Sequence, residues 1–314
     1  MFDNVTLKVY NLPKKDTLSG KLKGLYRSDT NTYKGMMGNM GVYKNNDCLR
    51  ICGSLPKYLN DENVTPLNRD GVKLAIEKLE NDFCLGLKNA VVCSVEFGVS
   101  IITKGKPFEY LQLFGNTKVL TRVEYSKWTG LETVTYTSKT GSFEFTGYDK
   151  AKEMIDNERN IPPLFSNSNV LRLEYRIRKR KGIKAKFARD LLACDLFCEN
   201  VYKAFQGLFL EAYMGIDKTG RLVYSDKSKK VTPVYLREFQ AEQYRQSYPK
   251  ENQYYLQKLK EAGQLAPRSL ERIRTADRKY DRNVYISDQN PLLRDLDAYI
   301  FDVMRSVDTS QNLR

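Results

Sequence analysis

Histidine is absent from all 314 residues of this sequence. Its absence excludes His-ligated metal sites, Ser-His-Asp and Cys-His nucleophile systems, and imidazole acid–base chemistry. Any catalysis must therefore use carboxylates, tyrosine, lysine, arginine, serine or cysteine.

Long apolar runs and closely paired cysteines are missing as well. No stretch of 18 apolar residues occurs, and the N-terminal sequence MFDNVTLKVYNLPKK has no charged segment followed by an apolar core and a cleavage site. We therefore expect a cytoplasmic protein without a membrane partner. The six cysteines include no CxxC pair, so neither a zinc ribbon nor a disulfide framework is indicated. Buried free thiols are the simpler interpretation.

Positive charge is in clear excess. The chain has 52 Lys and Arg against 38 Asp and Glu, a formal net charge of +14, which indicates a polyanionic partner with nucleic acid as the first candidate. The densest run, RIRKRKGIKAK at 176–186, holds seven basic residues in eleven positions. We expect phosphate contact there, with a solvated strand end as the alternative. The candidate DNA-binding residues are Arg172, Arg176, Arg178, Lys179, Arg180, Lys181, Lys184 and Lys186.

The hydrophobic pattern predicts a sheet followed by helices. Alternating apolar and polar residues are typical of strands, and apolar residues spaced by three or four are typical of helices. The predicted strands cover 2–10, 42–52, 91–103, three segments within 119–148, and 169–182. Helices are predicted over about 68–87, with Leu74, Leu79 and Phe83 on the apolar face, after residue 150, and over 186–213, 235–262 and 267–280.

These elements indicate an α+β fold. We expect an antiparallel-rich sheet with helices on one face as the catalytic domain, residues 1–185, and a mainly helical C-terminal domain, residues 186–314. In the predicted helix 186–213, Cys194 and Cys198 lie one turn apart on the apolar stripe, which is more typical of a core than of a metal site.

Two glutamates occupy the middle of predicted strands. Glu96 and Glu174 each alternate with apolar neighbours, and either one alone would ordinarily be an exposed sheet residue. If their strands are neighbours, both carboxylates share a face with the Tyr148 hydroxyl, while Phe143 and Phe145 point to the core. Two carboxylates on one face suit a hard divalent cation. A tyrosine beside such a cation could attack a DNA phosphate.

The segment TYTSKTGSFEFTGYDKAKE, followed by LRLEYRIRK, resembles the replication initiation factors of rolling-circle plasmids and filamentous-type phages, the Rep_trans and gene II/X group. The resemblance covers roughly residues 1–185, and YDKAKE and LRLEYRIRK are its most specific parts. It implies a nicking-endonuclease-like domain that cleaves a supercoiled origin and stays attached to the 5′ end through a tyrosine. It also implies a metal held by acidic residues.

Carried over residue by residue, the resemblance implies Tyr148 as nucleophile with Lys150 beside it. It also implies Glu96, Glu174, Asp149 and Glu153 as the acidic set that holds Mg²⁺ or Mn²⁺. The expected partners are the double-stranded origin and the nicked single strand, while a homodimer and contacts with host replication machinery stay open. The alternative function is a non-enzymatic origin- or operator-binding protein, in which the same basic residues only grip DNA.

Overall fold

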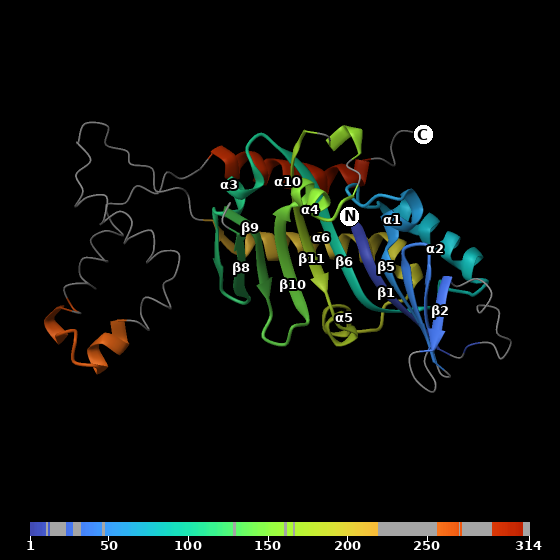
Figure 1. Ribbon diagram of the computed structural model, residues 1–314, viewed down its shortest axis with the longest axis horizontal. Coiled ribbons are helices and arrows are strands. Elements are labelled where there is room, and N and C mark those ends of the chain that lie inside the picture. Colours follow the sequence, from blue (N-terminus) through green and yellow to red (C-terminus); the bar gives the residue numbers. More distant parts are fainter. Residues whose placement is uncertain are drawn as a thin grey trace. The chain divides into compact units, whose positions relative to one another are not determined.

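The computed structural model contains a ten-stranded sheet (Figure 1). The structure describes residues 1–10, 12, 23–27, 33–45, 48–127, 130–159, 162–165, 167–218, 256–269, 271 and 291–309. The strand order is β2-β3-β4-β5-β1-β6-β11-β10-β9-β8, and neighbouring strands run antiparallel. The strands are β1 Phe2–Tyr10, β2 Lys23–Arg27, β3 Tyr33–Met37, β4 Met40–Lys44, β5 Cys48–Ser54, β6 Val91–Thr103, β8 Thr121–Lys127, β9 Gly130–Thr137, β10 Phe143–Asp149 and β11 Asn169–Ile177. The predicted antiparallel sheet of an α+β fold is therefore confirmed.

The helices lie mostly in the connections between these strands. They are α1 Leu55–Asn60, α2 Arg69–Phe83, α3 Pro107–Leu111, α4 Lys150–Asp156, α5 Arg180–Phe187, α6 Glu199–Met214 and α10 Pro291–Thr309, with 3₁₀ turns η1 Pro163–Phe165 and η2 Ala193–Phe197. In α2, Leu79 and Phe83 are buried as predicted, but Leu74 is 55% exposed. Ala75 and Ile76 take its place on the buried face, because that face is centred one position further along the helix. Within the described helices, none combines the length and apolarity needed to cross a bilayer.

An aromatic core joins the sheet to α6. Phe205 contacts Phe2 and Phe97 with ring centroids 5.1 and 5.9 Å apart, and Phe209 lies 5.4 Å from Phe145. These five rings are fully buried, and burial of each side chain stabilises the fold by roughly 1.5–3 kcal/mol. Because alternate residues of β6 and β10 face this core, the polar residues between them lie together on the opposite face of the sheet.

The chain after β11 differs from the prediction. The strand expected over 169–182 ends at Ile177, and the basic run continues as the helix α5. The helix expected over 186–213 is interrupted at Ala188, whose φ is 56°. Asp195 stabilises the non-helical segment that follows, because it accepts a hydrogen bond from the Leu192 amide at 2.7 Å. Cys194 and Cys198 consequently lie in η2 and at its end, and not on one helical stripe.

The chain divides into two compact units. The first comprises Met1–Gln112, Thr117–Ile216 and Ala298–Arg314, and the second comprises Leu113–Asn116 and Asp217–Asp297. Helix α6 therefore packs with the sheet, although it lies beyond the boundary predicted at residue 185. Apart from Thr117 and Ile216, the second unit contains the short sheet of β7 Phe114–Thr117 and β12 Ile216–Lys218. Most of the predicted helices 235–262 and 267–280 lies outside the described residues, so the helical C-terminal domain stays a prediction.

Candidate active site

Three buried carboxylates gather on the polar face of the sheet. Asp3 of β1, Glu96 of β6 and Glu174 of β11 each offer an oxygen, and these oxygens lie within 4.8 Å of one another. The three residues are at most 5% exposed. Strands β6 and β11 are neighbours, so the inference that Glu96 and Glu174 share a face agrees with the sheet order. A donor set made only of carboxylate oxygens fits a hard cation such as Mg²⁺ or Mn²⁺.

Asp3 was missed by the sequence reasoning because a register shift interrupts β1. The pairing of β1 with β6 shifts between Phe2 and Val5, so the simple alternation of faces fails at Asp3 and Asn4. The available signal was a carboxylate between apolar residues near the start of a strand. That pattern alone does not reveal which face the side chain occupies.

Tyr148 contacts this carboxylate group directly. Its hydroxyl donates a hydrogen bond to Oε1 of Glu174 at 2.8 Å. The contact follows from the register of β10 and β11, in which Thr146 is opposite Glu174 and Tyr148 is opposite Arg172, so the tyrosine and the glutamate are diagonal neighbours. Burial, followed by the negative charge of Glu174, raises the pKa of Tyr148 well above its usual value. Without added positive charge, the side chain is therefore a neutral phenol.

Two arginines hold the carboxylates in position. Arg172 is completely buried, and it pairs through Nε with Glu174 at 2.9 Å and through Nη2 with Asp3 at 3.0 Å. Arg176 pairs through Nε with Oε2 of Glu96 at 2.7 Å and also contacts Glu174. Arg172, predicted as a DNA contact, is therefore enclosed among carboxylates and is not accessible to DNA.

The two glutamates differ in ionisation. Burial, together with the charge of Glu174, raises the pKa of Glu96 to about 8. Burial also acts to raise the pKa of Glu174, but Arg172 and Arg176 outweigh it and lower this pKa to about 2. Near neutral pH the protein therefore holds Glu174 ionised and Glu96 mostly protonated. Two carboxyl groups with pKa values pushed apart are typical of sites that move protons.

The residues after Tyr148 have separate roles. Lys150 is 2% exposed, pairs with Oε2 of Glu153 at 2.9 Å, and lies with Nζ 5.9 Å from the centre of the Tyr148 ring. The other oxygen of Glu153 pairs with Arg159 at 2.9 Å. Asp149 accepts a hydrogen bond from the Lys152 amide at 2.9 Å and caps α4. The sequence-predicted ligands Asp149 and Glu153 thus lie outside the carboxylate group, which has Asp3 in their place.

A polar cavity of about 310 Å³ opens onto these groups. The three carboxylates, Glu153, Tyr148 and Lys150 line it, with further positive charge from Arg159, Arg176 and Lys57. Gly98 of β6 makes room for this arrangement, because a Cβ atom there would lie 2.4 Å from the Leu173 carbonyl oxygen and 3.0 Å from Cγ of Glu174. A tyrosine hydroxyl, a group of carboxylates that could hold a cation, and several cationic side chains therefore share one hollow.

The basic run after β11 is largely paired with acidic residues. Arg180 and Lys184 both contact Asp190, at 2.7 and 3.1 Å. Lys186 lies 3.8 Å from Glu211, and Lys179 donates a hydrogen bond to the Thr140 carbonyl at 2.6 Å. Lys181 is exposed, and the half-exposed Arg178 pairs with Glu144 at 2.7 Å. Most of the run is thus a helix whose cations pair with acidic residues elsewhere in the chain, and not a strand end with one row of phosphate-facing cations.

Comparison with known proteins finds no similar sequence and a distant structural similarity. No protein-family model matches the sequence, and no curated protein is detectably similar to it. Among solved structures, the fold is similar to that of a rolling circle replication initiator protein from Geobacillus stearothermophilus, with 10% sequence identity and a TM-score of 0.38. The match covers 77% of this chain and 95% of the other. A likeness this distant carries no information about the role of any residue.

Proposed function

We propose that the protein is a metal-dependent DNA nicking and joining enzyme that initiates rolling-circle replication, with Tyr148 as its nucleophile. The observation that carries this proposal is the 2.8 Å hydrogen bond from the Tyr148 hydroxyl to Glu174, a member of the buried carboxylate group. The motif YDKAKE, which contains Tyr148, supports the same function through its resemblance to replication initiation factors.

The reaction is a phosphoryl transfer. The Tyr148 oxygen attacks a DNA phosphorus, a tyrosine O–P bond forms, and the P–O3′ bond breaks. The phenolic proton passes to solvent, while Glu174 stays ionised and only orients the hydroxyl, and the 3′ oxygen leaves as a hydroxyl after taking up a proton from solvent. The product is a 5′-phosphotyrosine and a free 3′ end. Because a phenolate leaves more readily than an alkoxide, the 3′ hydroxyl can later reverse the step and rejoin the strand.

The surrounding residues orient the reacting groups. Asp3, Glu96 and Glu174 would hold Mg²⁺ or Mn²⁺, which would neutralise charge on the phosphoryl oxygens and favour ionisation of the tyrosine. Arg172 and Arg176 keep Glu174 ionised, so that it accepts the hydrogen bond that aims the Tyr148 oxygen. Lys150 adds positive charge 5.9 Å from the centre of the tyrosine ring.

The test is formation of a covalent adduct. Wild-type protein, incubated with supercoiled origin plasmid and Mn²⁺, is expected to give nicked circles and protein-linked 5′ ends. Tyr148→Phe removes one hydroxyl and keeps the ring, so it should bind DNA as the wild type does and form no adduct. Tyr299→Phe, a change at an exposed tyrosine of α10, serves as the matched control. An adduct that persists in Tyr148→Phe and maps to another tyrosine would refute the assignment.

A second candidate is the non-enzymatic origin- or operator-binding protein. The observation that favours it is the pairing of Asp3, Glu96 and Glu174 with arginines, as in an ion network that only supports the fold. In that case supercoiled plasmid stays intact with Mg²⁺ or Mn²⁺ at any protein concentration that saturates binding.

A further inference from the structure

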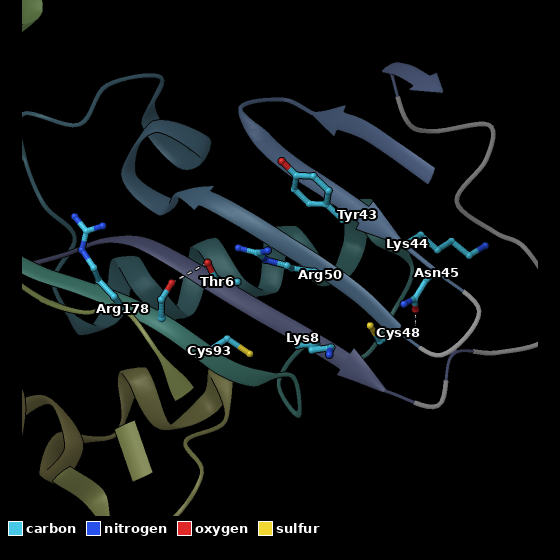
Figure 2. Close-up of a pocket in the computed structure, with 10 residues that line it drawn as sticks. Thr6, Lys8, Tyr43, Lys44, Asn45, Cys48, Arg50, Cys93 and Arg178 are labelled. Atoms are coloured by element: carbon cyan, nitrogen blue, oxygen red, sulfur yellow. Dashed lines mark hydrogen bonds between the residues drawn. The ribbon is translucent and has the colours of Figure 1, made fainter. Parts of the chain in front are cut away.

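A second hollow, of about 350 Å³, lies on the same sheet, and the charged residues that line it are all basic (Figure 2). It is formed over β1, β4, β5 and β6. Its lining includes Lys8, Lys44, Arg50, Arg178 and the ring of Tyr43. Among the described residues that line it, none is acidic. No ion pair links Lys8 or Arg50 to a carboxylate within the described part of the chain.

The strand register aligns the key side chains in one row. Lys34 is opposite Tyr43, Tyr43 is opposite Arg50, and Arg50 is opposite Lys8, across β3, β4, β5 and β1. Directly opposite residues lie on the same face, about 4.8 Å apart from strand to strand. Figure 2 shows Tyr43, Arg50 and Lys8 following one another across neighbouring strands.

The Tyr43 ring is accessible within this row. It is 37% exposed, with Lys34 Nζ 6.0 Å and Arg50 Cζ 5.6 Å from its centre. Cations with an exposed aromatic ring among them can contact phosphates and at the same time stack on a base. A duplex keeps its base faces covered, so only a single strand uses both features.

The hollow is connected to the Tyr148 cavity through ion pairs on one face. Arg178 lines the hollow and pairs with Glu144 at 2.7 Å, and Glu144 also pairs at 3.2 Å with Arg176, which lines the cavity. Along β1 and β6, hydrogen bonds from Ser94 to Thr6 and from Asn4 to Glu96 continue the polar surface between the two. The residues that line the two hollows are therefore linked across one face of the sheet.

We propose that the row of Lys34, Tyr43, Arg50 and Lys8 binds single-stranded DNA next to the cleaved phosphate, with a base stacked on Tyr43 and phosphates on Lys8 and Arg50. This inference rests on the proposed function of the Tyr148 cavity and assigns the path of its substrate. The strand continues past Arg178 toward Tyr148.

Binding is measured separately from cleavage. Fluorescence anisotropy with a labelled oligothymidylate of about 16 nucleotides, in EDTA and over a salt series, compares wild type with Lys8→Gln/Arg50→Gln, Tyr43→Ala and Tyr43→Phe. The control, Lys73→Gln/Arg268→Gln, removes the same charge from exposed positions off the sheet. A duplex of equal length and an oligouridylate are the competing ligands. Thermal melting verifies that each variant is folded.

The expected results follow from the row. Lys8→Gln/Arg50→Gln should reduce the salt slope of log affinity by about 1.4, at about 0.7 per lost contact on a single strand. Tyr43→Ala should weaken binding on the order of tenfold, and Tyr43→Phe should restore it because stacking needs only the ring. The control pair should bind as the wild type does, and duplex affinity should change less than single-strand affinity.

Other outcomes overturn the inference. These are absence of single-strand binding by the wild type, wild-type affinity in both Lys8→Gln/Arg50→Gln and Tyr43→Ala, equal losses for duplex, or tighter binding of the oligouridylate. The proposed function fails separately, since it requires an adduct at Tyr148. A protein that binds the single strand through this row but forms no adduct supports the inference and refutes the enzyme. If the wild type forms the adduct but the salt slope is unaltered in Lys8→Gln/Arg50→Gln, the enzyme is supported and the inference is refuted.

Discussion

The two hollows on the sheet use charge in opposite ways. In the Tyr148 cavity, Asp3 and Glu174 are buried and share one fully buried guanidinium, that of Arg172. In the hollow around Tyr43, Lys8 and Arg50 have no carboxylate partner among the described residues. The first arrangement fixes side chains for chemistry because moving any of them leaves a buried charge unpaired. The second keeps Lys8 and Arg50 available for a partner that arrives and leaves.

This difference predicts that loss of an arginine destabilises the protein strongly in the first hollow and only slightly in the second. Arg172→Met should lower the free energy of unfolding by about 3–5 kcal/mol, because it leaves the buried Asp3 without its cation and leaves Glu174 with Arg176 alone. Arg50→Gln should change it by no more than about 0.5 kcal/mol, as expected for a surface position. Denaturant unfolding of both variants measures the contrast. Arg172→Lys keeps the charge and should fall between them, which covers the case in which Arg172→Met does not fold. Equal stability of Arg172→Met and Arg50→Gln would remove the distinction between the hollows.

A smaller effect is expected from the protonated glutamate of the cavity. Because the pKa of Glu96 is about 8 in the folded protein and 4.5 is its ordinary value, the folded state retains a proton that the unfolded state has lost between these pH values. Stability contributed by this group is therefore present below about pH 4.5 and is lost as the pH rises toward 8. Glu96→Gln resembles the protonated form and has no such loss.

The measurement is the difference in unfolding free energy between Glu96→Gln and wild type, in EDTA, from pH 5 to pH 8. The difference should move in favour of the variant as the pH rises. Glu174→Gln is the contrasting control, since the pKa of Glu174 lies near 2 and its charge is constant over this range. A pH-independent difference for Glu96→Gln would mean that Glu96 is already ionised at pH 5 and that the cavity holds more negative charge than inferred.

Sequence alone predicted the strands of this cavity, because alternation along a strand is a local property. It predicted the shared face of Glu96, Glu174 and Tyr148 only on the condition that their strands are neighbours, and the sheet order meets that condition. It did not predict Asp3, since the register shift in β1 alters the face at that point. Nor did it distinguish Arg172 from Arg178: both are arginines on β11 or just after it, but one is enclosed by carboxylates and the other is half exposed. What covers a charged side chain depends on strand order and register, which a single sequence does not contain.

The row of Lys34, Tyr43, Arg50 and Lys8 escaped the sequence reasoning for a related reason. Its members come from four strands and form no run along the chain. The conspicuous run, 176–186, attracted the DNA-binding prediction because seven basic residues are adjacent in sequence. Folding brings Asp190 against Arg180 and Lys184, so part of that charge is already compensated.

The smallest expected effect tests this last point. Arg180→Gln/Lys184→Gln removes two charges, as Lys8→Gln/Arg50→Gln does, but from cations that share Asp190. We expect the salt slope for oligothymidylate binding to fall by much less than about 0.7 per residue, because a cation already paired with a carboxylate releases few counterions from the DNA. Asp190→Asn, which removes the partner and leaves both cations, should raise the slope slightly if these side chains can reach the strand.

If Arg180→Gln/Lys184→Gln lowers the slope as much as Lys8→Gln/Arg50→Gln, the ion pairs with Asp190 open on binding. The basic run would then hold phosphates as its sequence indicates, and the contrast between paired and unpaired cations would not determine where this protein holds DNA.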